Sequence, residues 1–223
     1  MEELLNRIAH CVEFGKINLA SPYPPDMKGQ EGADELTKKA IEDGANPDDV
    51  LKKGLVVGMQ KIGIKFRENK VFVPQVLMSA KAMSTAMEHL KPFFQSGDVK
   101  RKGVFVIGTV AGDLHDIGKN LVSMMVEGSG FEVVDLGTDV SSAKFIDAVK
   151  SHPGCYVGLS ALLTTTMTNM EQIAKDIKAA HPDTMVLIGG APVSEEFKDK
   201  IHADFYSPDP QGAVDFLNQM AEA

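Results

Sequence analysis

The chain has 223 residues, which is enough for one large domain or two small ones, and its pattern favours two. Its 23 Lys and Arg residues against 31 Asp and Glu residues give a formal net charge of −8. Because there is also no basic cluster, this charge argues against nucleic acid or an anionic membrane surface as a partner. We therefore expect partners that are proteins or small molecules.

Two further features bear on where the protein works. The first residues carry no basic region or cleavage pattern of a signal peptide, and Cys11 and Cys155 fall in what are predicted to be different domains. No apolar run approaches the roughly 20 residues that span a bilayer. We expect a soluble, cytoplasmic, thiol-reduced protein with no membrane partner.

Residues 1–92 carry the spacing of amphipathic helices and predict a four-helix bundle domain. The predicted helices are residues 4–14, 35–42, 46–66 and 74–90. Asn46 can cap the third helix and Pro47 suits its first position, while Pro74 starts the fourth. Residues 18–32 contain three prolines. They predict a loop whose length is more typical of a functional or mobile segment than of a plain connection.

Residues 93–102, with Gly97 and several charges, predict a linker, after which the periodicity changes. Short apolar runs that predict strands now alternate with helical stretches. The strands are predicted at 104–107, 132–135, 156–159, 185–188 and 203–206, and the helices near 118–128, 142–151, 167–181, 193–201 and 210–221. Residues 103–223 therefore predict an α/β domain: a doubly wound, flavodoxin-like or Rossmann-type five-stranded parallel sheet with helices on both faces.

The loop after the first predicted strand holds the residues with the most chemistry. In a doubly wound sheet this loop lies at the carboxyl edge of the strands, where α/β proteins bind ligands. It carries Asp113, His115 and Asp116. The Asp113 carboxylate can engage one imidazole nitrogen of His115 and leave the other basic and pointing outward. This is the arrangement of a metal ligand with its supporting carboxylate.

Several other interpretations stay open on the residue pattern alone. An Asp-x-His pair can be a solvated turn, and a His-Asp metal hydrolase would need further ligands that the chain does not obviously supply. The glycines at 108, 112 and 118 do not match the spacing of phosphate-binding loops. A receiver domain would end its third strand in an Asp, where this chain has Gly158-Leu159-Ser160. The fold class alone therefore does not assign a function.

The string Gly-Asp-Leu-His-Asp-Ile-Gly-Lys-Asn at 112–120 matches the D-x-H-x-x-G signature of cobalamin-binding domains. It closely resembles methionine synthase and the small corrinoid methyl-carrier proteins of methylotrophic methyltransferase systems, and the resemblance covers nearly the whole chain. It implies a cobalamin or related corrinoid cofactor, in methylcobalamin and Co(I) forms. It further implies that His115 displaces the cofactor's dimethylbenzimidazole and ligates cobalt, and that Gly112, Asp113, Asp116 and Gly118 belong to the cofactor site.

The resemblance also assigns residues at the ends of later strands. By itself, the run Ser160 to Thr166 is typical of a helix cap, and Gly189-Gly190 is typical of a tight turn. In cobalamin domains the residues matching Ser160 and Thr164 contact the displaced nucleotide tail, and the one matching Thr166 hydrogen-bonds the Asp partner of the axial His. The glycine pair lets backbone approach the tail, and residues 206–210 resemble the segment that closes the slot around it.

In the helical domain, Phe66, Phe72, Val73 and Val76 would by default be ordinary core residues. The string 72–76 resembles the cap of methionine synthase, whose matching residues cover the methyl-bearing face of the corrin. Such an apolar cover shields a reactive Co–CH₃ bond and Co(I) from water and oxidants. The cap must then move aside before a substrate reaches cobalt.

The function that the resemblance implies is a methyl-carrying corrinoid subunit of a multi-component methyltransferase system. In one-carbon metabolism of methylated amines or related donors, it would carry the methyl group from a substrate-specific methyltransferase to a second methyltransferase that uses a folate or thiol acceptor. His115, Asp113 and Thr166 would serve the catalytic cycle, and a reductive activator protein would rescue oxidised cobalt. Whether such a carrier is itself an enzyme, and which donor, acceptor, lower base and oligomeric state apply, stay open.

The alternative is a non-catalytic cobalamin sensor or storage module. A sensor usually carries an output domain, for which a cap and a cobalamin domain in 223 residues leave little room. A mutase subunit is disfavoured because such subunits generally lack the methyl-face cap.

Overall fold

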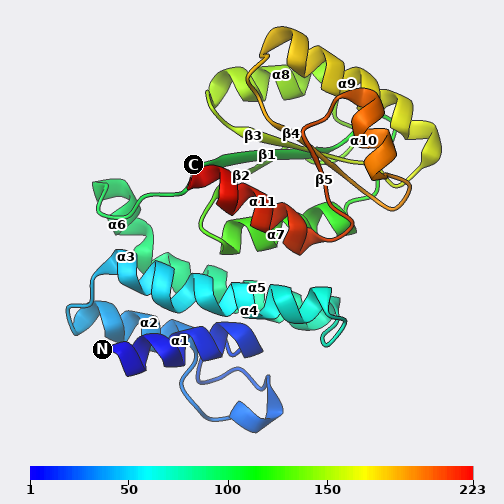
Figure 1. The fold of residues 1–223 in the computed structure, drawn as a ribbon. Helices are drawn as coiled ribbons and strands as arrows, with labels where there is room; N and C mark the ends of the chain where they lie inside the picture. The colour runs from blue at the N-terminus through cyan, green and yellow to red at the C-terminus, as the bar shows by residue number, and fades with distance from the viewer. Residues whose placement is uncertain (223) are drawn as a thin grey trace. The chain divides into compact units, whose positions relative to one another are not determined.

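The computed structural model describes residues 1–222, which divide into two compact units (Figure 1). The helical unit comprises Met1–Arg101, and the α/β unit begins at Lys102. The predicted fold class, helices followed by a five-stranded parallel sheet, is confirmed. The predicted domain limits of 1–92, 93–102 and 103–223 stay predictions, and Ala223 lies outside the described residues. Within residues 1–222, no helix is both long and apolar enough to cross a bilayer.

The helical unit contains more segments than the four predicted helices. Its elements are α1 Glu2–Phe14, η1 Pro25–Met27, α2 Ala33–Glu42, α3 Pro47–Asp49, η2 Val50–Leu55, α4 Val56–Arg67, α5 Val73–Met87, η3 Glu88–Leu90 and α6 Lys91–Ser96. The third predicted helix is present, but its residues Val50–Leu55 are wound as a π-helix between α3 and α4. Part of the predicted linker is also helical, because Pro92 lies in the first turn of α6, which Gly97 stops with a φ of 85°.

Close approach of α1 and α4 forms the centre of the helical unit. Ile8 and Val12 are fully buried on α1. A Cβ added to Gly58 on α4 would lie 2.6 Å from the carbonyl oxygen of Ala9 and from Val12. Only glycine allows the two backbones this separation.

The loop 18–32 is held in place at several points. The ammonium group of Lys16 is fully buried and donates to the carbonyl of Ser21 at 2.8 Å. The Glu35 carboxylate accepts from the backbone N–H groups of Leu19 and Gly32, each at 2.9 Å. These charge-assisted bonds give the loop an ordered path despite its length.

The α/β unit is an all-parallel sheet in the order β2-β1-β3-β4-β5. Its strands are β1 Val104–Thr109, β2 Glu132–Asp135, β3 Tyr156–Ser160, β4 Val186–Gly189 and β5 Phe205–Tyr206. Its helices are α7 Ile117–Gly128, α8 Ser142–Ser151, η4 Thr164–Thr166, α9 Met167–Ala180, α10 Glu195–Ile201 and α11 Pro210–Ala221. The strand order changes direction between β1 and β3, so the loops after these two strands flank the switch point where such sheets bind ligands.

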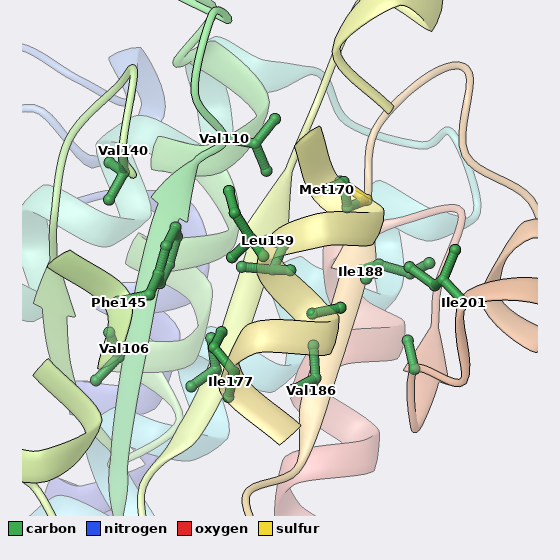
Figure 2. Packing of buried hydrophobic residues seen from close by; sticks show 14 of the residues in the cluster. Val106, Val110, Val140, Phe145, Leu159, Met170, Ile177, Val186, Ile188 and Ile201 are labelled. Carbon is green, nitrogen blue, oxygen red and sulfur yellow. The ribbon is translucent and has the colours of Figure 1, made fainter. Parts of the chain in front are cut away.

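Helices cover both faces of the sheet, as predicted. Helices α8, α9 and α10 lie on one face, and α7 and α11 lie on the other (Figure 1). The first of these interfaces is a continuous apolar core in which Val106, Leu159 and Val186 of the strands meet Phe145 of α8 and Ile177 of α9 (Figure 2). This rigid core supports the loops at the carboxyl edge.

Candidate functional site

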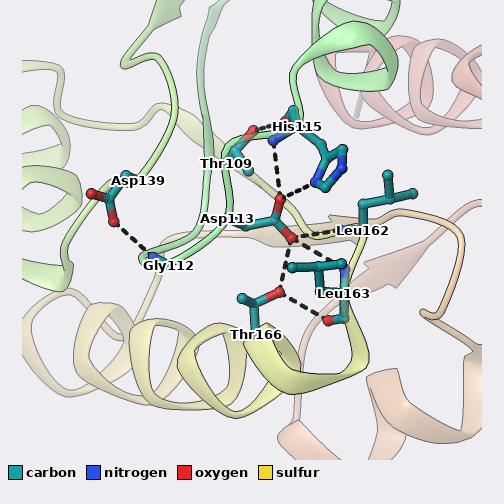
Figure 3. A network of polar contacts seen from close by, with 8 residues as sticks. All are labelled: Thr109, Gly112, Asp113, His115, Asp139, Leu162, Leu163 and Thr166. Carbon is teal, nitrogen blue, oxygen red and sulfur yellow. Dashed lines mark hydrogen bonds and ion pairs between the residues drawn. The ribbon is translucent and has the colours of Figure 1, made fainter.

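Asp113 is the centre of a hydrogen-bond network at the switch point (Figure 3). Its side chain is fully buried. One carboxylate oxygen lies 3.1 Å from the backbone N–H of His115 and 2.8 Å from the ring nitrogen Nδ1. The other accepts from the backbone N–H groups of Leu162 at 2.8 Å and Leu163 at 3.2 Å, and from the Thr166 hydroxyl at 2.8 Å. The predicted Asp113, His115 and Thr166 are therefore brought together.

These contacts decide the protonation of the site. Burial by itself would raise the pKa of Asp113, but the hydrogen bonds from Leu162, His115 and Thr166 outweigh it and hold that pKa well below its ordinary value. The ionised carboxylate only accepts, so Nδ1 of His115 donates to it. The imidazole side chain is 52% exposed. Nε2 is then the basic nitrogen available to a ligand.

Two polar side chains that the sequence analysis did not single out support the same loop. The hydroxyl of Thr109, the last residue of β1, is buried and donates to the backbone carbonyl of His115 at 2.8 Å. From α9, the Asn169 amide donates to the carbonyl of Ala111 at 2.7 Å. Neither position carries a local sequence signal, because each contact depends on how the strand or helix packs against the loop.

Four exposed apolar side chains accompany His115. Leu114, next to His115, and Ile117, the first residue of α7, are 74% and 76% exposed. Leu162 and Leu163, whose N–H groups bind Asp113, are 44% and 41% exposed. None of these four residues was predicted to belong to the site. Apolar side chains gathered around an exposed basic nitrogen suit a flat, largely apolar ligand that places a metal over that nitrogen.

A slot of about 440 Å³ runs between α7 and α11 on the sheet face that these helices cover. Its lining includes the predicted Gly118, Ser160, Gly189 and Gly190 and the whole predicted segment 206–210. A Cβ on Gly190, whose φ is 131°, would lie 1.8 Å from the carbonyl oxygen of Ala161. A Cβ on Gly118 would meet nothing within 4 Å, so a side chain there would occupy open space in the slot.

A buried cation also lines this slot. Lys119 of α7 is 3% exposed, forms an ion pair with Asp135 and donates to the Asn120 amide oxygen at 2.7 Å. In the sequence, Lys119 is part of the motif at 112–120 but was not predicted to be a site residue.

The other predicted site residues lie apart from the network and the slot lining. Thr164 is exposed and Asp116 accepts from the Asn120 amide at 3.0 Å. In the helical unit, Val76 is fully buried, whereas Phe66 and Val73 are half-buried. Phe72 is 69% exposed. The default interpretation of Phe72 as a core residue is therefore wrong, since the start of α5 leaves its ring uncovered.

Comparison with known proteins assigns this arrangement to a family. Residues 103–214 match the family model of the B12 binding domain, and residues 29–91 match a second B12 binding domain model. Dimethylamine corrinoid protein 1 of Methanosarcina acetivorans is 41% identical over 216 residues, covering 96% of this chain and 95% of the relative. The chain belongs to the corrinoid protein family. Its cofactor is therefore a cobalamin or a related corrinoid, and its family function is to carry methyl groups.

Two further matches extend the comparison. Trimethylamine corrinoid protein 1 of the same organism is 38% identical over 195 residues, covering 86% of this chain and 89% of the relative. The methanol:cobalamin methyltransferase complex MtaBC from Methanosarcina barkeri superposes with a TM-score of 0.82 at 28% identity, covering 99% of this chain and 80% of that chain.

The residues present fit a corrinoid. The oriented Nε2 of His115 supplies one nitrogen ligand, the apolar side chains beside it suit the macrocycle, and the glycine-walled slot suits a long tail that leaves the ring. Gly118 lines the slot and has no side chain to enter it, whereas a Cβ on Gly190 would meet the backbone of Ala161.

Proposed function

We propose that this protein carries a methyl group on its corrinoid between a methyltransferase specific for a methylated amine and a second methyltransferase that uses a folate or thiol acceptor. The observation that carries the proposal is the His115 ring, fixed through Nδ1 by the buried Asp113 carboxylate and exposed on its other side. The corrinoid, when bound, supplies the cobalt that accepts and releases the methyl group.

The residues of the network have separate roles in this proposal. His115 would hold the cobalt through Nε2, because its other ring nitrogen, Nδ1, is bonded to Asp113. Asp113 keeps the proton on Nδ1, and the Thr166 hydroxyl, 2.8 Å from Asp113 and 2.9 Å from the Leu163 carbonyl, can turn from one acceptor to the other. The hydrogen bonding of Asp113 can thus adjust to a change in the basicity of His115 by rotation of this hydroxyl, without movement of the loop.

The slot is proposed to hold the displaced nucleotide tail. Ser160, Gly189 and Gly190 line it at the strand ends, and residues 206–210 close one side. Thr164 is exposed and outside this lining, so a direct contact with the tail has less support than that of Ser160. Phe66, Phe72, Val73 and Val76 of the helical unit stay proposed as the cap of the methyl-bearing face.

Two observations support the amine donor and the partner. Relatives named for dimethylamine and trimethylamine are 41% and 38% identical to the chain, whereas the methanol complex is 28% identical. The methanol complex is also a structure with its methyltransferase, which supports a similar partner here. We further propose a reductive activator, because Co(I) oxidises easily, and a cytoplasmic location where these partners work.

The test is single-turnover methylation of the protein loaded with cobalamin and reduced to Co(I). Purified methyltransferases for mono-, di- and trimethylamine and for methanol are added one at a time with their donors, and the visible spectrum is followed. We expect methylation with one amine enzyme only, and none without an enzyme, since amine methyl groups are poor electrophiles that need activation in a dedicated site. Methylation with the methanol enzyme alone, or with no enzyme, would contradict the proposal.

The axial role of His115 is tested by electron paramagnetic resonance of the Co(II) form. With ¹⁵N-labelled protein and unlabelled cofactor, we expect ¹⁵N coupling that is absent in His115→Ala. Coupling to ¹⁴N of the cofactor's own base would show that His115 does not bind cobalt.

A further inference from the structure

The loop that carries His115 is held from two sides by groups other than the Asp113 carboxylate. On one side, the buried hydroxyl of Thr109 donates to the His115 carbonyl at 2.8 Å. On the other side, Asp139, in the segment between β2 and α8, accepts from the Gly112 N–H at 2.7 Å and donates its own N–H to the Asp113 carbonyl at 3.0 Å. Figure 3 shows Asp139 beside Gly112 and Thr109 beside His115.

Asp139 has the backbone conformation that this double contact requires. Its φ is 54°, in the left-handed region that Asp and Asn tolerate better than most residues. Gly112, its partner, has a φ of 80°. In this conformation the N–H and the carboxylate of Asp139 reach the same neighbouring loop, one on each side of the peptide that precedes Asp113.

The segment that bears Asp139 is itself fixed to β1. The N–H of Thr109 donates to the carbonyl of Gly137, and the N–H of Val140 donates to the carbonyl of Thr109, each at 2.9 Å. Val110 and Val140 also form a parallel bridge and are buried. Thr109 thus connects the sheet, the Asp139 segment and the His115 carbonyl through three hydrogen bonds.

We propose that Thr109 and Asp139 are positioning residues that set the His115 imidazole in place before the corrinoid binds. Neither reaches the ring, and both act through the backbone of residues 112–115. We call the hydrogen bonds of Thr109 and Asp139 to residues 112–115 the clamp. A side chain that is already held in position loses less conformational entropy when it binds a metal, so the clamp favours the state in which His115 ligates cobalt. The inference rests on the proposed axial role of His115.

The variants are chosen to remove one hydrogen bond at a time. Thr109→Val keeps the β-branched shape and removes the hydroxyl, while Thr109→Ser restores it. Asp139→Gly keeps the left-handed backbone and removes the carboxylate, while Asp139→Asn keeps both the conformation and an accepting oxygen. Two matched controls lie elsewhere in the α/β unit: Thr184→Val, at a buried Thr before β4, and His202→Gly, at a left-handed residue with a φ of 56°.

The first readout uses the full chain without cofactor. Exchange of the Leu162 amide hydrogen is measured by nuclear magnetic resonance, because this N–H binds the Asp113 carboxylate and touches neither Thr109 nor Asp139. We expect Thr109→Val and Asp139→Gly to speed its exchange roughly three- to tenfold, as fits the loss of one hydrogen bond. Ser and Asn variants and both controls should exchange at the wild-type rate. If only the Gly112 amide exchanged faster, the proposal would be overturned, because the loss of the Asp139 carboxylate would then affect only the group that it binds directly and not the position of the His115 loop.

The second readout uses the cobalamin-loaded Co(II) protein at saturating cofactor. The ratio of ¹⁵N-coupled to uncoupled signal measures how much cobalt is bound by His115. We expect this ratio to fall roughly three- to tenfold in Thr109→Val and Asp139→Gly and to recover in Thr109→Ser and Asp139→Asn. An unchanged ratio, or an equal fall in the controls, would overturn the clamp. If the wild-type protein itself lacks ¹⁵N coupling, the axial role of His115 is wrong, and the amide exchange still decides whether the clamp exists.

Discussion

Asp113 shows how one buried carboxylate organises a site from separate parts of the chain. Its two oxygens accept from His115 in its own loop and from Leu162, Leu163 and Thr166 about fifty residues later. Two of these donors are backbone N–H groups of exposed leucines, so the same residues orient the carboxylate and present an apolar surface. The depressed pKa of Asp113 is the consequence.

This pKa predicts how stability depends on pH in the protein without cofactor. Because the folded-state pKa lies below the ordinary value of 3.8, the stabilisation is complete above about pH 3.8 and is lost as pH falls towards the folded pKa. Asp113→Asn should lower the free energy of unfolding at pH 7 by about 1.5–3 kcal/mol. The difference from wild type should shrink below pH 3.8. Urea unfolding at several pH values measures it, with the exposed Asp183→Asn as control, and a constant difference would contradict the prediction.

Phe72 gives a second prediction at the level of a residue. Since its side chain is 69% exposed, Phe72→Ala should change the free energy of unfolding by no more than about 0.5 kcal/mol. If Phe72 covers the methyl-bearing face, the variant loaded with methylcobalamin should photolyse severalfold faster. Leu77→Ala, at another exposed apolar residue of α5, is the control. Equal photolysis of wild type and Phe72→Ala would remove Phe72 from the cap.

Among the elements, α7 and α11 matter most because the slot lies between them. The other sheet face is filled by the core under α8, α9 and α10. On the slot face Gly158 supplies no side chain, and a Cβ there would lie 2.5 Å from the Phe105 ring. The apolar core therefore fills one face of the sheet, whereas on the other face the slot is lined by Gly158 together with Phe105, Ile107 and Leu187.

Gly118 provides the sharpest test of the slot. A Cβ there meets nothing within 4 Å, so Gly118→Leu should leave the fold intact, and replacing a helical glycine should not cost stability. Its side chain would enter the open space, and we expect cobalamin affinity to fall at least about tenfold, or about 1.4 kcal/mol. Calorimetric titration measures this, with Ala143→Leu on the exposed surface of α8 as control. Unchanged affinity would show that the cofactor does not occupy the slot.

At the scale of the whole molecule, the main feature is the point at which the chain passes from the helical unit to the α/β unit. The described units meet at Arg101 and Lys102, near the end of the predicted linker, whose first residues instead form α6. Between α6 and β1 the chain has no regular structure, and Lys100 is exposed there. The loop 18–32 is longer, yet Lys16 and Glu35 bind its backbone.

Limited proteolysis of the full chain tests the predicted division. We expect trypsin to cut first at residues 100–102, because cleavage requires local unfolding and this stretch lies between α6 and β1 without helix or strand hydrogen bonds. Lys28, exposed within the anchored loop, should be cut later. Mass spectrometry of the early fragments identifies the site, and a first cut at Lys28 would show that the anchored loop opens more readily than the predicted linker.

Local pattern was sufficient to predict the fold class, because helix and strand periodicities are properties of neighbouring residues. Each predicted strand is present within one or two residues of its expected ends. The π-helical turn at Val50–Leu55 was not predicted, because it depends on how the helices pack. Helix α6 was not predicted either, because it is a short helix that ends at the left-handed Gly97. The motif at 112–120 was sufficient to indicate the cofactor.

Tertiary structure alone decided how that motif is supported. The sequence determined that His115 has a carboxylate within reach. The bonds from the N–H groups of Leu162 and Leu163 could not be predicted from it, because every residue except proline has a backbone N–H. Asp139 binds Gly112 although the two residues are 27 positions apart in the chain. The exposure of Phe72 and of the leucines beside His115 also depends on which surfaces the packed helices leave uncovered. Bonds made by backbone groups and distant side chains arise only when β1 pairs with β2 and β3 and the loops after these strands come to one edge of the sheet.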